Sequence, residues 1–107
     1  MSEQKEQSRA QQLMGDFAPK LAELTDDVLF GDVWARAELS PRDRSLITVA
    51  ALIANGNIAQ LSSHLKLAKA NGLSETELAE VMTHLAFYTG WPRAISAILV
   101  AKELFKE

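Results

Sequence analysis

The chain has 107 residues, of which 48% are hydrophobic and 23% are charged, and this is the size and composition of one folded domain. Its 11 basic and 14 acidic side chains give a net charge of −3. That charge argues against a nucleic-acid-binding module, because such a module usually presents a basic face to phosphates. The chain contains no cysteine, which excludes disulfides, thiolate metal sites and cysteine nucleophiles.

Neither a membrane anchor nor an export signal is predicted. No apolar run reaches the roughly 18 residues that a membrane span needs. The first residues, MSEQKEQ, are polar and unlike a secretory signal. We therefore expect a cytoplasmic protein.

The first third of the chain is predicted to be a polar arm followed by a helix. No stretch alternates polar and apolar residues in the manner of a strand, so the fold class is predicted to be all-α, a compact bundle of about five to six helices. Residues 1–18 form the polar N-terminal arm, with a loose helix over residues 3–14. A helix from Pro19 to Phe30, ended by Gly31, opens the single helical domain predicted for residues 19–107.

The next predicted helix is unusually apolar. Ser40 and Pro41 are typical of a helix start, and Gly56 suits the left-handed residue that ends a helix after Asn55. After Arg44 nearly every residue of this segment is apolar. A helix that is apolar on all sides should be buried on all sides, so we expect it at the centre of a bundle or covered by a neighbouring subunit.

Three further helices are predicted, over about residues 58–70, 74–89 and 92–105. The second of them opens with Ser74 and Glu77, the spacing of a capping box in which each side chain binds the other residue's backbone amide. The last helix carries an apolar stripe made of Ile95, Ile98, Leu99 and Leu104.

The two histidines are the candidate acid or base groups. His64 lies at the edge of the apolar stripe of its helix, where it is either a proton carrier at a cavity wall or a half-buried structural residue. Glu80, His84 and Tyr88 are four residues apart and so share one helix face. This column is a catalytic relay, a solvated polar face or a set of contacts between subunits.

Arg42 and Arg44 lie in the first turn of the apolar helix. Together with free backbone amides they can form a carboxylate-binding mouth. The alternative is that they pair with the acidic N-terminal segment. The chain has no glycine-rich phosphate loop, no nucleophile elbow and no close metal-ligand spacing, so no metal site is predicted.

Two segments resemble the carboxymuconolactone decarboxylase family. They are LSPRDRSLITVAALIA, from residue 39, and LAFYTGWPRA, from residue 85, and the resemblance extends over about residues 21–100. It implies an all-helical fold shared with alkylhydroperoxidases, assembled as trimers or hexamers. It also implies conversion of 4-carboxymuconolactone to the β-ketoadipate enol-lactone and CO2, in aromatic-acid breakdown, with no organic cofactor or metal.

The peroxidase branch of this superfamily uses a Cys-x-x-Cys-x-x-x-His motif. His64 matches its histidine, whereas Asn57 and Gln60 stand where the two cysteines would be. Thiol-based peroxide reduction is therefore excluded for this chain.

The resemblance also implies roles for particular residues. Decarboxylation needs fixed positive charge for the substrate carboxylate and a group that protonates the product. The leading proton donor is His64, with His84 and its neighbour Glu80 as the second catalytic candidates. The predicted substrate-binding residues are Arg42, Arg44, Trp34, Phe87, Tyr88 and Trp91. Two alternatives stay open, namely another small-metabolite lyase on the same scaffold and a non-catalytic oligomeric binding protein.

Overall fold

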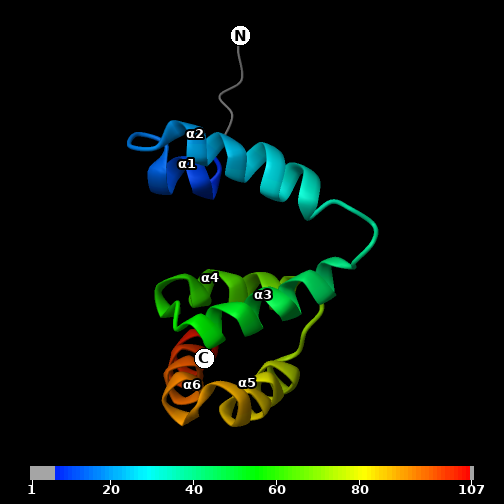
Figure 1. Cartoon of the computed structure of the whole chain (residues 1–107), viewed down its shortest axis with the longest axis vertical. Helices are drawn as coiled ribbons and strands as arrows, with labels where there is room; N and C mark the ends of the chain where they lie inside the picture. Colours follow the sequence, from blue (N-terminus) through cyan, green and yellow to red (C-terminus); the bar gives the residue numbers. More distant parts are fainter. Residues whose placement is uncertain (1–6, 107) are drawn as a thin grey trace. The chain divides into compact units, whose positions relative to one another are not determined.

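The structure, a computed structural model, describes residues 7–106 and is helical throughout (Figure 1). This confirms the all-α prediction for the described residues, in which no strand occurs. No helix among them is long and apolar enough to span a membrane. The chain divides into two units between Glu38 and Leu39. The helices are α1 (Arg9–Met14), α2 (Pro19–Leu24), the π-helix η1 (Thr25–Val33), α3 (Pro41–Asn55), α4 (Ile58–Ala70), α5 (Glu75–Thr89) and α6 (Trp91–Phe105).

The first unit holds α1, α2 and η1. Ser8 caps α1 by accepting a 3.0 Å hydrogen bond from the amide of Gln11, and its hydroxyl donates to Asp26 Oδ2 over 2.7 Å, which ties α1 to η1. The border predicted after residue 18 lies between α1 and α2, and both helices belong to this unit.

The prediction that Gly31 ends the second helix is wrong. The chain continues from α2 directly into η1, which ends at Val33. Within the described part of the chain, the glycines with positive φ are Gly56, Gly72 and Gly90, so Gly31 does not adopt the left-handed conformation that would end a helix. The hydrogen bonds widen instead to the π pattern, in which Trp34 N–H donates to the carbonyl of Leu29 over 2.9 Å.

The second unit holds α3 to α6, and its helix ends follow the predicted caps. Ser40 accepts a 3.0 Å hydrogen bond from Asp43 N–H at the start of α3, and Gly56 closes that helix with φ +72°. Both hydrogen bonds of the predicted capping box between Ser74 and Glu77 are present at the start of α5. The last helix begins at Trp91, one residue before the predicted start.

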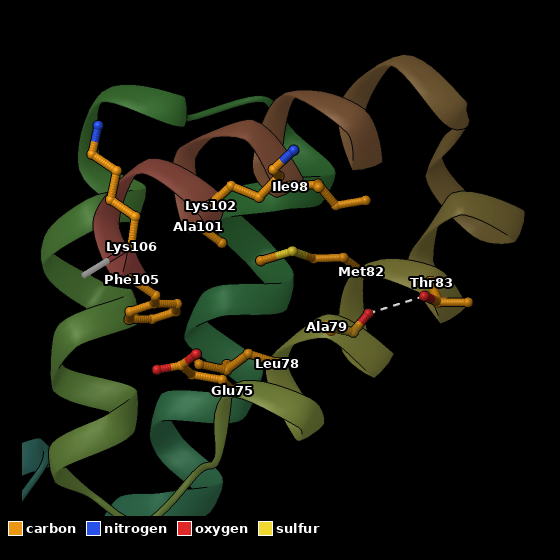
Figure 2. Close-up of a pocket in the computed structure, with 10 residues that line it drawn as sticks. All are labelled: Glu75, Leu78, Ala79, Met82, Thr83, Ile98, Ala101, Lys102, Phe105 and Lys106. Carbon is orange, nitrogen blue, oxygen red and sulfur yellow. Dashed lines mark hydrogen bonds between the residues drawn. The ribbon is translucent and has the colours of Figure 1, made fainter.

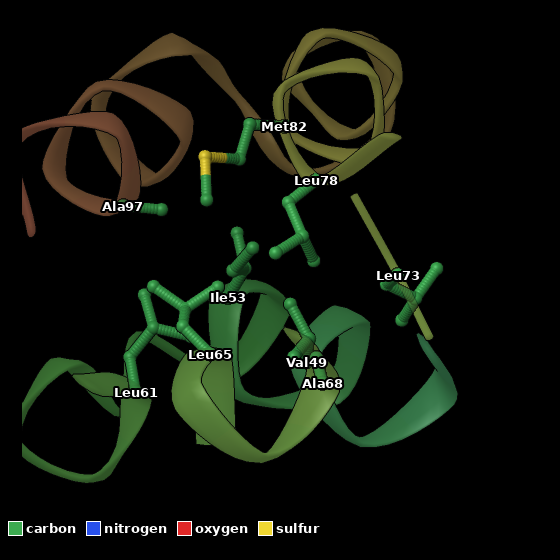
Figure 3. Close-up of a cluster of buried hydrophobic side chains, with 9 residues drawn as sticks. All are labelled: Val49, Ile53, Leu61, Leu65, Ala68, Leu73, Leu78, Met82 and Ala97. Carbon is green, nitrogen blue, oxygen red and sulfur yellow. The ribbon is translucent and has the colours of Figure 1, made fainter. Parts of the chain in front are cut away.

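The hydrophobic core lies among the four helices of the second unit (Figure 3). Helix α3 packs mainly against α4, and α5 packs mainly against α6, while α4 also contacts α6. Figure 3 shows Ile53 of α3 and Leu65 of α4 pointing toward Leu78 and Met82 of α5. The buried cluster consists of Val49, Ile53, Leu61, Leu65, Ala68, Leu73, Leu78, Met82 and Ala97.

Two predicted apolar helix faces are partly exposed in the single chain, and the coverage of α3 by a neighbouring subunit stays a prediction. Helix α3 buries only one face, and Ile47 on the opposite side is 55% exposed. The alanines of α3 make it apolar without requiring burial on every side. Helix α6 turns Ala94 and Ala97 inward and leaves Leu99, from the predicted stripe, 60% exposed. Small inward side chains allow close helix packing, so the larger residues lie outside.

Candidate active site

A cavity of about 480 Å³ lies between α3 and α5 in the second unit. Helix α3 contributes one stripe of residues spaced four apart, and α5 contributes two. One end of the cavity is charged, one side carries an imidazole, and the remaining wall is apolar. The lining residues are Arg42, Leu46, Ala50, Leu73, Glu77, Glu80, Val81, His84 and Leu85.

The charged end is an ion pair between two helix starts. Arg42 Nη2 on α3 donates to Glu77 Oε2 on α5 over 2.5 Å, and Arg42 Nη1 lies 3.5 Å from Asp43 Oδ1. Glu77 Oε1 accepts a 2.9 Å hydrogen bond from the backbone amide of Ser74. The hydrogen bond from the Ser74 amide has the largest effect on the pKa of Glu77 and lowers it. Burial, the next largest effect, raises it, and the hydrogen bond and charge of Arg42 lower it again, so the pKa lies below its usual value of 4.5.

The imidazole side is formed by one face of α5. Glu80 and His84, one turn apart, both line the cavity. The ring of His84 stacks on that of Tyr88, with centroids 4.9 Å apart and planes at 27°. Of the predicted Glu80–His84–Tyr88 column, the contact between His84 and Tyr88 is therefore present. Tyr88 itself is exposed and does not line the cavity.

The other predicted site residues lie elsewhere. His64 on α4 and Arg44 on α3 are half-buried, and neither lines this cavity. The rings of Phe87 and Trp91 meet edge to face, with their centroids 5.1 Å apart. Both side chains lie on the exposed side of the α5–α6 junction. Trp34 belongs to the first unit, where its ring lies 5.4 Å from that of Phe30.

A second cavity, of about 400 Å³, lies between α5 and α6 (Figure 2). Its apolar floor includes Met82 and Phe105, and Lys102 and Lys106 stand at its rim. It contains no histidine, so it lacks the acid–base group that the first cavity has. Within residues 7–106, no three metal-ligating side chains gather in a way that would hold an ion.

Some site residues were not predictable from local sequence. Glu77 was expected as a capping residue on the side of the helix that carries Glu80 and His84, whereas its binding to Arg42, 35 positions earlier in the chain, was not expected. The apolar wall residues Leu46 and Ala50 lie one and two turns beyond Arg42. Their spacing from Arg42 was the available signal, but the face of α3 that meets α5 depends on packing.

Comparison with known proteins identifies the family. The sequence profile of the carboxymuconolactone decarboxylase family matches residues 19–103. A 4-carboxymuconolactone decarboxylase of Acinetobacter baylyi is 33% identical over 104 residues, which cover 97% of this chain and 78% of that protein. A nitrosuccinic acid decarboxylase of Metarhizium robertsii is 33% identical over 85 residues, 79% of this chain and 59% of that protein. The chain belongs to the carboxymuconolactone decarboxylase family.

Proposed function

We propose that this protein decarboxylates a small carboxylated, lactone-like metabolite and that the cavity between α3 and α5 is its active site. The observation that carries the proposal is the meeting of Arg42, Glu80 and His84 at one largely apolar cavity. Both relatives described above are named as decarboxylases, which supports the reaction type.

Arg42 is the proposed anchor for a substrate carboxylate. Its guanidinium has five N–H donors. Nη2 donates to Glu77, and Nη1 forms an ion pair with Asp43. The remaining donors can bind a carboxylate oxygen through charge-assisted hydrogen bonds. The apolar wall, which includes Leu46 and Leu85, can contact the rest of the substrate. Apolar contacts reduce the hydration of the carboxylate that leaves as CO2.

His84 is the proposed proton donor. In the reaction the carbon–carboxylate bond breaks, CO2 leaves, and the electron pair passes into the neighbouring electron-accepting group, which is the unsaturated lactone of 4-carboxymuconolactone or the nitro group of nitrosuccinic acid. The imidazolium of His84 then gives a proton to the resulting carbanionic carbon and becomes neutral. Glu80, one turn away on the same face, is proposed to orient the ring. Each turnover consumes one proton, which His84 regains from the solvent.

The first substrate to test is 4-carboxymuconolactone, because the Acinetobacter relative with that name matches 97% of this chain. Nitrosuccinic acid, from the name of the Metarhizium relative, is the second. The experiment measures CO2 release by the purified protein from each. We expect turnover of one of them. A folded protein that releases no CO2 from either would remove both named substrates and favour another carboxylated metabolite or a non-catalytic binding role.

The two histidines serve as matched controls for each other. We expect His84→Ala to lower kcat by about 10²- to 10⁴-fold, the usual contribution of a positioned acid. His64→Ala, outside the cavity, should keep most of the activity. The reverse result would assign the proton donor to α4, as the family resemblance implies. Arg42→Ala should lower kcat/KM by about 10- to 100-fold, the loss of hydrogen bonds to a charged group.

We further propose that the protein is a homo-oligomer, a trimer or hexamer, in which a hydrophobic ridge meets a second copy. The ridge consists of Phe87, Trp91, Ile95 and Leu99, and Phe87 is 74% exposed in the single chain. Monomers rarely expose large contiguous apolar patches. Leu99→Glu should therefore give a smaller assembly by light scattering. Gln60→Glu, which adds the same charge at an exposed residue of α4, should leave the assembly unchanged.

A further inference from the structure

Glu77 uses its two carboxylate oxygens for different purposes. Oε1 accepts the 2.9 Å hydrogen bond from Ser74 N–H, and Oε2 accepts the 2.5 Å hydrogen bond from Arg42 Nη2. One oxygen therefore completes the cap of α5, and the other binds the cation of the cavity. A residue that served only as a helix cap would not need the second contact.

The cap keeps this carboxylate beside Arg42. Ser74 Oγ accepts a 3.0 Å hydrogen bond from Glu77 N–H, so both the backbone and the side chain of Glu77 are held at the first turn of α5. The side chain cannot swing away from Arg42 without losing its bond to the Ser74 amide. The pKa of Glu77 lies below its usual value of 4.5, so the group is ionised at neutral pH.

The fixed negative charge changes what the cavity offers to an anion. Arg42 brings one positive charge to the lining, and the carboxylates of Glu77 and Glu80 bring two negative ones. A carboxylate that binds Arg42 comes close to the carboxylate of Glu77 and is repelled by it. Arg42 also lies 3.5 Å from Asp43 Oδ1, so one ionic contact of its guanidinium does not depend on Glu77.

We infer that Glu77 is a specificity-determining residue, a built-in carboxylate that weakens the binding of carboxylate ligands to Arg42. The inference rests on the proposed role of Arg42 as a carboxylate anchor. Weaker binding of the substrate carboxylate favours the reaction, because tight binding in the ground state raises the activation barrier to decarboxylation. A weakly held substrate carboxylate is closer in free energy to the transition state.

The test is a titration with succinate, a small unreactive dicarboxylate. The side-chain Nε–H resonance of Arg42, assigned with the Arg42→Lys variant, is followed by ¹⁵N NMR. Glu77→Gln keeps an oxygen for the Ser74 amide but removes the charge. We expect the Kd for succinate to fall at least about threefold in this variant, since a like charge next to the bound anion has gone. The difference should shrink in 1 M NaCl, which screens charges.

Two variants separate this role from folding and from net charge. Ser74→Ala removes the hydrogen bond to Glu77 N–H but keeps the backbone amide that binds Glu77 Oε1, so it should lower stability while leaving the Kd for succinate unchanged. Glu75→Gln removes one charge from the same helical turn, where Glu75 pairs with Lys69 over 2.7 Å instead of Arg42, and should also leave the Kd unchanged. Circular dichroism confirms that each variant is folded.

The titration gives a result whether or not the protein turns over a substrate. A Kd that is unchanged or higher in Glu77→Gln overturns the inference, and the proposed decarboxylation then still stands on its own assay. A lower Kd in a protein that releases no CO2 keeps the inference and removes the reaction. If succinate does not shift the Nε–H resonance of Arg42 in any variant, Arg42 does not bind carboxylates and the inference is overturned. Where turnover is present, KM should fall with the Kd.

Discussion

Asn71 Nδ2 donates a 3.0 Å hydrogen bond to Ser45 Oγ, which joins the end of α4 to the first half of α3. Ser45 is 1% exposed and is the one fully buried polar side chain in the described part of the chain. A buried hydroxyl is costly unless it is hydrogen-bonded, so this contact stabilises the packing of α4 on α3 near the charged end of the cavity between α3 and α5.

Replacement of Asn71 by leucine should therefore destabilise the protein. The Ser45 hydroxyl would lose this hydrogen bond, at a cost of about 1–3 kcal/mol in the free energy of unfolding, measured in urea. Ser45→Ala in the Asn71→Leu background removes the stranded hydroxyl and should recover much of the loss. If the two changes instead add without coupling, the contact does not stabilise the folded state.

Two isoleucines on α3 give a matched pair for the core. Ile53 is fully buried, so Ile53→Val should cost about 0.5–1.5 kcal/mol of unfolding free energy. Ile47→Val removes the same methyl group from a side chain that is 55% exposed, and should cost clearly less. An equal cost at both sites in urea unfolding would mean that a second subunit covers Ile47, as the apolar sequence of this helix predicts.

Glu77 should make stability dependent on pH on the acidic side. Its pKa is lower in the folded state than the usual 4.5, so its ionised form stabilises the protein above that value. This contribution is lost as the pH falls through the folded-state pKa. The stability difference between wild type and Glu77→Gln should therefore be constant above about pH 5.5 and shrink below 4.5. Urea midpoints at several pH values check this, and a constant difference down to pH 3 would contradict it.

Gly56 should resist substitution because of its backbone conformation. Its φ is +72°, and a Cβ there would lie 3.2 Å from Arg93 Nη1. Gly56→Ala should cost about 1–2 kcal/mol, the penalty for a left-handed residue with a side chain. Gly56→Asn adds the same Cβ, but asparagine tolerates this conformation better, so its melting temperature should lie above that of the alanine variant. Equal melting temperatures would assign the cost to the Arg93 contact.

The helix boundaries of the second unit were predictable because their causes are local. Ser40, Gly56 and the Ser74–Glu77 box act within one helical turn, and each acts as predicted. The run from α2 into η1 was not predictable, because a glycine ends a helix only when it adopts a positive φ. Gly31 does not, and nothing in its immediate sequence says so.

The site was predictable in composition but not in arrangement. Arg42, Glu80 and His84 could be singled out by residue type and spacing, and they line one cavity. The binding of Glu77 to Arg42, and the exposed position of Phe87, depend on how whole helices meet. The proton donor favoured by the motif, His64, lies on α4 outside the cavity lining, so the roles of the two histidines stay predictions.

Several residues of the cavity wall also stabilise the fold, and this limits how the ligand specificity of such an enzyme can change. Leu46, Val81 and Leu85 face the cavity and also pack against the hydrophobic core, so a change at any of them disturbs folding as well as ligand shape. Ala50 lines the cavity without belonging to that packed set. Among the apolar wall positions, new ligand shapes can thus evolve most freely through the size of residue 50, while Leu46, Val81 and Leu85 are held by selection for stability.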